Sequence, residues 1–257
     1  MRGRGVDRGS MRSLFSWKSE AELAAVVVRC LVGAGWDVYQ EVALSNFHAG
    51  RADIVAARGE LTWVVETKLA ASFDLVGQAR DWIHYASMVS VAVPSAHHRN
   101  RGRGVFMDLC RDLGLGVLEV RKIHDWEQSR YHADSDLDRE MSILVWPRLR
   151  RVPKADRRGA TLRSRLLEEH KTFAPAGNAA GAFWSPWRAT LKAAEVAVRA
   201  NPGCTLKELV SGLTHNHYQA ERTARACIAR DIIAGRVPAL RVDTDRKPWR
   251  VHLTEVK

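Results

Sequence analysis

Three ionisable residues, Asp53, Glu66 and Lys68, stand where a short hairpin would bring them together. They belong to the stretch GRADIVAARGELTWVVETKL, in which Arg-Gly-Glu separates two apolar runs. Runs rich in Val, Ile and Trp around a Gly-X pair predict a β-hairpin, because glycine takes the positive φ of a tight turn. If Gly59 and the next residue form the loop, Asp53 pairs with Glu66. The period of two along a strand then places Lys68 on the same face as Glu66.

This spacing favours a cation site. Opposed side chains in an antiparallel pair lie about 5 Å apart at Cβ, and like charges there are destabilising unless a cation joins them. Two carboxylates and the backbone carbonyl of Thr67 form an all-oxygen donor set, which suits Mg²⁺ or Mn²⁺. We expect the Thr67 side chain to point to the opposite face and to be structural. A Glu-x-Lys pair can also be a solvated strand face, but the strand VVETK is apolar up to its charges.

The surrounding elements predict an α/β domain. The apolar pattern indicates a helix from Ser19, a strand before the hairpin, and then two helices that each precede a strand. The expected bounds are 19–34 for the first helix, 36–42 for the first strand, 73–85 and 106–113 for the later helices, and 88–93 and 117–120 for their strands. The hairpin therefore lies within the order αβββαβαβ.

This order resembles the PD-(D/E)xK nuclease superfamily, in which Asp begins the second strand and Glu-x-Lys ends the third. The resemblance covers residues 17–122, and Ala52 replaces the frequent Pro before Asp53. It implies a restriction-endonuclease-like mixed sheet flanked by helices and a Mg²⁺-dependent deoxyribonuclease, with Mn²⁺ as the alternative ion. Asp53 and Glu66 would hold the metal, and Lys68 would orient the attacking water.

The resemblance also implies site residues on two helices. An acid in the first turn of the first helix would point at the metal, with Glu22 favoured and Glu20 as the alternative. Acids there also simply complement the helix dipole. Gln78 on the next helix would reach the site, with Trp82 as the aromatic residue four positions later, or it would be an ordinary surface residue.

Composition favours a polyanionic partner. The 257 residues carry 40 Lys and Arg against 29 Asp and Glu, a net charge of +11. This balance points to nucleic acid first and an acidic membrane second. No apolar run of about 18 residues exists to span a bilayer. Four widely spaced cysteines without a CxxC argue against a zinc site or disulfide framework and indicate a reducing, cytoplasmic compartment.

Four parts are predicted along the chain. Residues 1–16 are expected to be disordered, 17–122 form the nuclease domain, 123–186 form a basic connector and linker, and 187–257 form a second domain. A basic loop after the strand at 88–93 offers phosphate contacts from Arg99, Arg101 and Arg103, or is only solvated. The same two alternatives hold for the basic run within the connector.

The second domain resembles a winged helix, because three predicted helices are followed by two strands. The helices are expected at 188–200, 205–213 and 216–234, and the strands at 237–242 and 249–253. In that fold the third helix enters the major groove with its N-terminal residues. The implied DNA contacts are Tyr218, Gln219, Arg222 and Arg225 on that helix, and Arg246 and Lys247 on the wing. A protein-interaction module is the alternative.

The sequence therefore predicts a metal-dependent DNA endonuclease that hydrolyses phosphodiester bonds. The alternative is a DNA-binding regulatory protein with an inactive nuclease core, and a third hypothesis is a scaffold whose basic segments bind RNA. DNA is the expected partner and a membrane is not. Cleavage specificity, endo- against exonuclease action and oligomeric state stay open, a homodimer among the alternatives.

Overall fold

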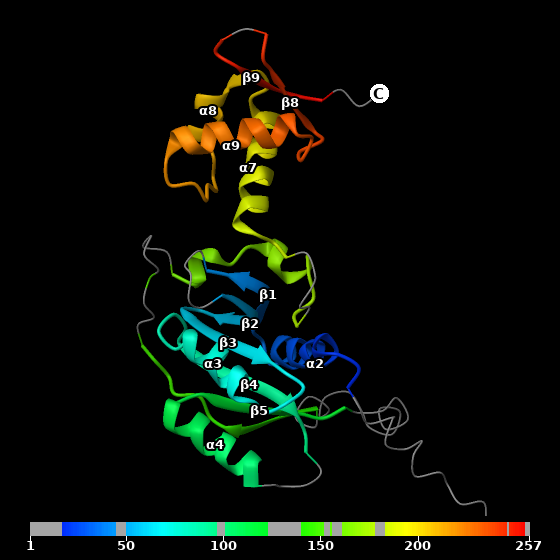
Figure 1. Cartoon of the computed structure of the whole chain (residues 1–257), viewed down its shortest axis with the longest axis vertical. Helices are drawn as coiled ribbons and strands as arrows, with labels where there is room; N and C mark the ends of the chain where they lie inside the picture. The colour runs from blue at the N-terminus through cyan, green and yellow to red at the C-terminus, as the bar shows by residue number, and fades with distance from the viewer. Residues whose placement is uncertain are drawn as a thin grey trace, which may run out of the picture. The chain divides into compact units, whose positions relative to one another are not determined.

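A six-stranded mixed sheet lies at the centre of the first of two units, residues 1–183 and 184–257 (Figure 1). This computed structural model describes residues 17–44, 50–96, 101–122, 140–151, 155, 161–177, 183–245 and 247–254. Neighbouring strands follow chain order, and β3, β4 and β5 are parallel while the other pairs are antiparallel. The strands are β1 (Asp37–Ala43), β2 (Arg51–Arg58), β3 (Leu61–Thr67), β4 (Met88–Pro94), β5 (Gly116–Val120) and β6 (Met141–Val145).

Helices cover both faces of this sheet. Helix α2 (Glu20–Gly33) packs on one face, and α3 (Phe73–Asp81) and α4 (Arg101–Leu113) pack on the other. Both β-α-β crossovers run in the same direction along the sheet, which places α3 and α4 on a common face. The predicted α/β architecture, a mixed sheet flanked by helices, is confirmed at this level.

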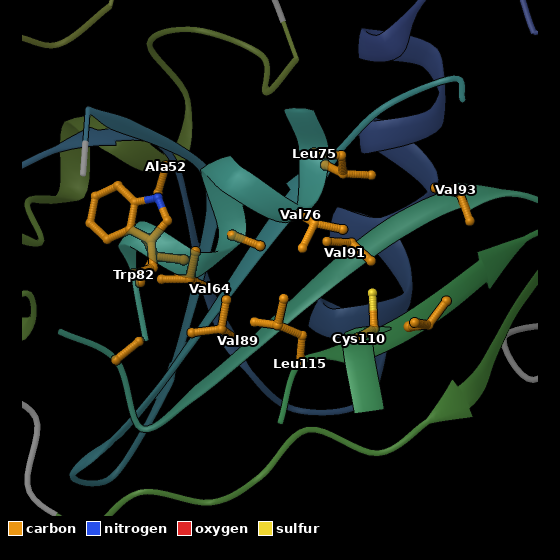
Figure 2. Close-up of a cluster of buried hydrophobic side chains, with 14 of the residues drawn as sticks. Ala52, Val64, Leu75, Val76, Trp82, Val89, Val91, Val93, Cys110 and Leu115 are labelled. Carbon is orange, nitrogen blue, oxygen red and sulfur yellow. The ribbon is translucent and has the colours of Figure 1, made fainter. Parts of the chain in front are cut away.

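Two apolar clusters fill the space between the sheet and its helices. Alternate residues of the hairpin strands enter different clusters, so that Ile54 and Val65 pack with α2 whereas Val55 and Val64 pack with α3 and α4. Figure 2 shows the second cluster, in which Trp82 is fully buried. The hairpin is therefore covered on both sides, and its strands are held rigidly.

The range 123–186, expected to be a connector, contributes to the first unit where it is described. Strand β6 extends the sheet beyond β5, and the short 3₁₀ helices η1 (Arg163–Arg165) and η2 (Glu168–Lys171) follow it. Gln40 of β1 bonds the segment at two points, because its amide donates to Lys171 O at 3.0 Å and accepts from Ala176 N at 2.9 Å.

The second unit contains three helices and a three-stranded sheet of order β7-β9-β8. Its elements are α7 (Pro186–Ala200), β7 (Cys204–Thr205), α8 (Leu206–Ser211), α9 (Glu221–Ile233), β8 (Leu240–Asp243) and β9 (Arg250–Leu253). A capping box of Thr205 and Glu208 opens α8. Helix α9 begins later than predicted, because Asn216 Oδ1 accepts from Tyr218 N at 3.0 Å and holds the preceding residues in a turn.

Some predictions fall on residues outside the described ranges. These include the disorder expected for residues 1–16 and the DNA contacts expected from Arg99 and Arg246. In the described parts of the chain, no helix is long and apolar enough to cross a membrane. The four cysteines are free thiols.

Candidate functional site

The hairpin pairs in the predicted register. Ile54 pairs with Val65 and Arg58 with Leu61, which brings Asp53 and Glu66 opposite each other at the end of the ladder. Gly59 takes a φ of 55° in the connecting turn. The hairpin therefore places two carboxylates side by side next to a buried core.

The Asp53 carboxylate is held by Thr67. Its Oδ2 accepts from Thr67 N at 2.8 Å and from Thr67 Oγ1 at 2.9 Å. The expectation that the Thr67 side chain faces away is therefore wrong. The β2–β3 ladder ends at Ile54 and Val65, and Asp53 supplies the acceptor that the Thr67 amide would otherwise lack. Whether the Thr67 carbonyl binds a metal stays a prediction.

Glu66 is the more deeply buried acid of the pair, with 3 % of its surface exposed. Within the described residues its Oε1 has no hydrogen-bond partner. Burial raises the pKa of Glu66 well above its ordinary value, and the charges of Asp53 and Glu41 act in the same direction, while a hydrogen bond from the Trp82 indole opposes them. Burial also raises the pKa of Asp53, against the lowering effect of its bonds from Thr67. The pair therefore favours keeping a proton when no cation is bound.

Lys68 follows β3 directly. Its backbone N–H donates to Ala92 O at 3.1 Å, which ties this residue to strand β4. The side chain is half-buried, and within the described ranges no hydrogen bond or ion pair forms at its Nζ. The ammonium is thus available to another anion.

Glu22 is not brought to the carboxylate pair. Its carboxylate accepts from Lys18 N at 2.7 Å and forms an ion pair with Lys122 at 2.7 Å. The hydrogen bond and charge of Lys122 lower the pKa of Glu22. Helix α2 packs on the face of Ile54 and Val65, whereas Glu66 follows the alternation of Val64 on the other face. The alternative, Glu20, is half-buried in the same first turn of α2.

Helix α3 reaches the site through Trp82 and not through Gln78. Gln78 is exposed, while Trp82 is fully buried at the C-terminal end of the helix. Figure 2 labels Trp82 in the same cluster as Ala52 and Val64, which lie one and two residues from the acids in sequence. The indole bond to Glu66 therefore comes from the residue whose size also fills the core.

Sequence reasoning missed a third acid, Glu41 on β1. Gln40 pairs with Ile54 and Val42 with Ala52, so Glu41 lies across from Asp53. Glu41 is 2 % exposed and contacts Arg51 in an ion pair. The only available signal was one acid inside the apolar strand DVYQEVA. We call Glu41, Asp53 and Glu66 the carboxylate row.

Of the two described arginines that were predicted to contact phosphate, Arg103 is bonded within the unit and Arg101 is exposed. Arg103 forms an ion pair with Glu119 and donates to Pro94 O at 3.3 Å, which ties α4 to the ends of β4 and β5. Arg101 is exposed at the first residue of α4. Of these two, only Arg101 presents an exposed guanidinium.

A basic groove of about 1250 Å³ lies on the second unit. Its lining comes from α9, the start of α8 and the segment before β9, and its apolar members include Ala226, Ala229, Ile233 and Trp249. Among the described residues, five cationic side chains and no acid line it: Lys207, Arg222, Arg225, Arg230 and Lys247. Three of these were predicted DNA contacts, whereas Lys207 and Arg230 were not.

Tyr218 and Gln219 do not line this groove. Tyr218 packs against the apolar core of the second unit, and burial raises the pKa of its hydroxyl to about 12. Gln219 is exposed in the turn before α9. The later start of α9 therefore separates both residues from the groove-lining face of the helix.

The carboxylate row is not a ready-made metal centre. Among the described residues, no three His, Cys, Asp or Glu side chains are grouped so that they hold an ion as they stand. Comparison of the chain with protein-family models, curated proteins and solved structures gave no match.

Proposed function

We propose that the protein is a Mg²⁺- or Mn²⁺-dependent DNA endonuclease of the PD-(D/E)xK type. The observation that carries this proposal is the Asp53–Glu66 pair, in which Glu66 is buried and its Oε1 has no hydrogen-bond partner within the described residues. A buried polar atom without a partner costs about 1–3 kcal/mol, more if charged. A bound cation would offset that cost.

The donors fit a hard divalent cation. Asp53 and Glu66 offer carboxylate oxygens, which Mg²⁺ and Mn²⁺ prefer over softer ligands. The Thr67 amide and hydroxyl both donate to Oδ2 of Asp53, and a side-chain hydrogen bond joins the Asp53 and Glu66 carboxyl groups. A bound ion would take the place of the shared proton in that bond. When bound, the cation would polarise a phosphate and lower the pKa of a water.

The neighbouring residues have separate tasks in this proposal. Thr67 fixes the orientation of Asp53, and Trp82 holds Glu66 from the side of α3. Lys68, at the end of the same strand, orients the attacking water and offsets the negative charge that develops on the phosphate. Its backbone bond to Ala92 keeps it next to the pair.

The second unit would bind the DNA. The order of its helices, with β7 and β8 on either side of β9, supports a winged-helix arrangement. The described lining of the groove contains Arg222, Arg225 and Lys247 and no acid, and this charge suits a phosphate backbone. The net charge of +11 acts in the same direction.

A DNA-binding regulatory protein with an inactive core is the second candidate. The ion pair between Arg51 and Glu41 favours it, because a fixed cation beside the carboxylate row could replace a metal permanently. A Gln78 that is exposed on α3 favours it as well.

Cleavage separates the two candidates. The protein is incubated with supercoiled, linear and branched DNA, once in Mg²⁺ and once in chelator. Asp53→Asn is the variant expected to be inactive. Glu60→Gln, at an exposed position of the turn, is the matched control. The nuclease proposal expects Mg²⁺-dependent products from wild type and Glu60→Gln only. DNA binding without any cleavage, unaffected by chelator, would support the regulatory protein instead.

A further inference from the structure

The carboxylate row crosses three adjacent strands. Glu41 on β1 lies across from Asp53 on β2, and Asp53 lies across from Glu66 on β3. Opposed residues of antiparallel strands have Cβ atoms about 4.5–5.5 Å apart. The flanking pairs therefore put the three acids at neighbouring positions on three adjacent strands, and Asp53 occupies the middle.

The two ends of this row differ in whether a cationic side chain of the described residues forms an ion pair with the acid. Glu41 and Glu66 are both almost fully buried, and Arg51 forms an ion pair with Glu41. At the other end, Glu66 Oε1 is buried with no hydrogen-bond partner among the described residues. A divalent ion at the row would bring two positive charges to three acids, where the guanidinium of Arg51 brings one.

The other acid considered for a third ligand is occupied elsewhere. Glu22 is bonded to Lys122 and to Lys18 N, on the helix that covers the opposite face of the sheet. Glu41, in contrast, comes from the strand that flanks Asp53. Its φ of 56° is uncommon for a residue with a side chain, and such backbone is found where surrounding structure enforces it.

We propose that Glu41 supplies the third carboxylate of the cation site and that Arg51 is its counter-ion only in the cation-free state. This proposal rests on the function proposed above. It requires the Glu41 carboxylate to exchange Arg51 for the ion, because no three His, Cys, Asp or Glu side chains of the described residues are grouped to hold an ion as they stand. Arg51 is partly exposed and lies over the Phe183 ring at 4.9 Å, so it can turn toward solvent when released.

The test counts bound Mn²⁺ by electron paramagnetic resonance, with cleavage as a second readout. Glu41→Gln keeps an acceptor for Arg51 but removes the charge. We expect it to bind Mn²⁺ at least 10-fold more weakly than wild type and to lose cleavage. Glu22→Gln makes the same change at the other acid, and Glu60→Gln makes it at an exposed position of the hairpin turn. Both should bind Mn²⁺ as wild type does.

Two results would overturn the role of Glu41. The first is Mn²⁺ binding by Glu41→Gln at wild-type affinity while Glu66→Gln loses it, which leaves the proposed function intact. The second is a loss in Glu22→Gln instead. A wild-type protein that binds no Mn²⁺ overturns both this inference and the proposed function.

A second variant tests the proposal if circular dichroism shows that Glu41→Gln does not fold. Arg51→Gln removes the competing guanidinium, so it should bind Mn²⁺ more tightly than wild type. Unchanged or weaker Mn²⁺ binding by Arg51→Gln would contradict the exchange of Arg51 for a cation.

Discussion

At the scale of single residues, the environment of Glu66 sets the chemistry of the site. The side chain is buried beside Asp53 and near Glu41, so ionising it in the cation-free protein adds a second or third negative charge to a region of low polarity. The protein limits this cost by keeping a proton on the pair. A divalent cation would replace the proton and allow both acids to ionise.

The proton on Glu66 leads to a pH prediction for the cation-free protein. Because burial and the charge of Asp53 raise the pKa of Glu66 in the folded state, its contribution to stability is complete below its unfolded pKa of about 4.5. That contribution is lost as the pH rises through the folded pKa, at about 1.4 kcal/mol for each pH unit between the two values.

The measurement is the free energy of unfolding by urea in chelator, from pH 4.5 to 8. Asp53 also has a raised pKa, so the informative quantity is the difference between wild type and Glu66→Gln. We expect the wild type to lose more stability than the variant as the pH rises. If the free energy of unfolding changes equally with pH in wild type and in Glu66→Gln, then Glu66 titrates alike in the folded and unfolded chains.

Lys68 is the residue proposed to act on the water and the phosphate. Its Nζ makes no hydrogen bond or ion pair with the described part of the chain, so Lys68→Ala should change the melting temperature little. It should lower the cleavage rate at least 100-fold, because it removes charge stabilisation in the transition state. Single-turnover cleavage is compared with that of Lys18→Ala, an exposed lysine before α2. Wild-type cleavage by Lys68→Ala would remove Lys68 from the mechanism.

At the scale of elements, local signals predicted the hairpin and its register well. Gly59 and the apolar runs on either side specify the turn, and the turn then determines every pair up to Ile54 and Val65. The loop between β1 and β2 carries no comparable turn signal, so the register that brings Glu41 to Asp53 could not be obtained from sequence. The proximity of these two acids was missed for that reason.

Tertiary contacts explain the other differences at this scale. Strand β6 forms because β5 offers a free edge, and its residues alternate between half-buried and exposed, which is a weak signal in five residues. The third helix of the second unit was expected to begin at Asn216, but α9 begins at Glu221. Asn216 bonds Tyr218 N in a local turn instead, because asparagine competes for nearby backbone groups.

Helix α9 and the segment before β9 carry the prediction for DNA binding. Arg222→Ala with Lys247→Ala removes two cations from the groove, so duplex affinity should fall, and the slope of log affinity against log salt should decrease by about 1 for each phosphate that is no longer neutralised. Fluorescence anisotropy at several salt concentrations measures both quantities. Arg241→Ala is the control, because this exposed residue of β8 lies outside the groove lining. An equal loss of affinity in Arg241→Ala would indicate a general charge effect.

At the scale of the whole molecule, the two units have separate apolar cores. The clusters of the first unit contain α2, α3 and α4, and that of the second contains residues of α7, α8 and α9. Removing residues 184–257 should therefore leave the first unit folded, with weaker DNA binding and slow Mg²⁺-dependent cleavage. The assay compares affinity and cleavage of both chains at equal salt. Full affinity in the shortened chain would assign DNA binding to the first unit.

Asp53 and the buried Glu66 are proposed to hold a divalent cation. Thermal melts test this role most directly, with wild type and Glu66→Gln each measured in chelator and in Mg²⁺. A ligand that binds only the folded state stabilises it, so Mg²⁺ should raise the melting temperature of wild type and raise that of Glu66→Gln less. In chelator, Glu66→Gln should be at least as stable as wild type, because burial and the charge of Asp53 already disfavour the ionised form of Glu66, and the neutral amide removes that ionisation. A variant that is markedly less stable in chelator and responds to Mg²⁺ as wild type does would contradict this role.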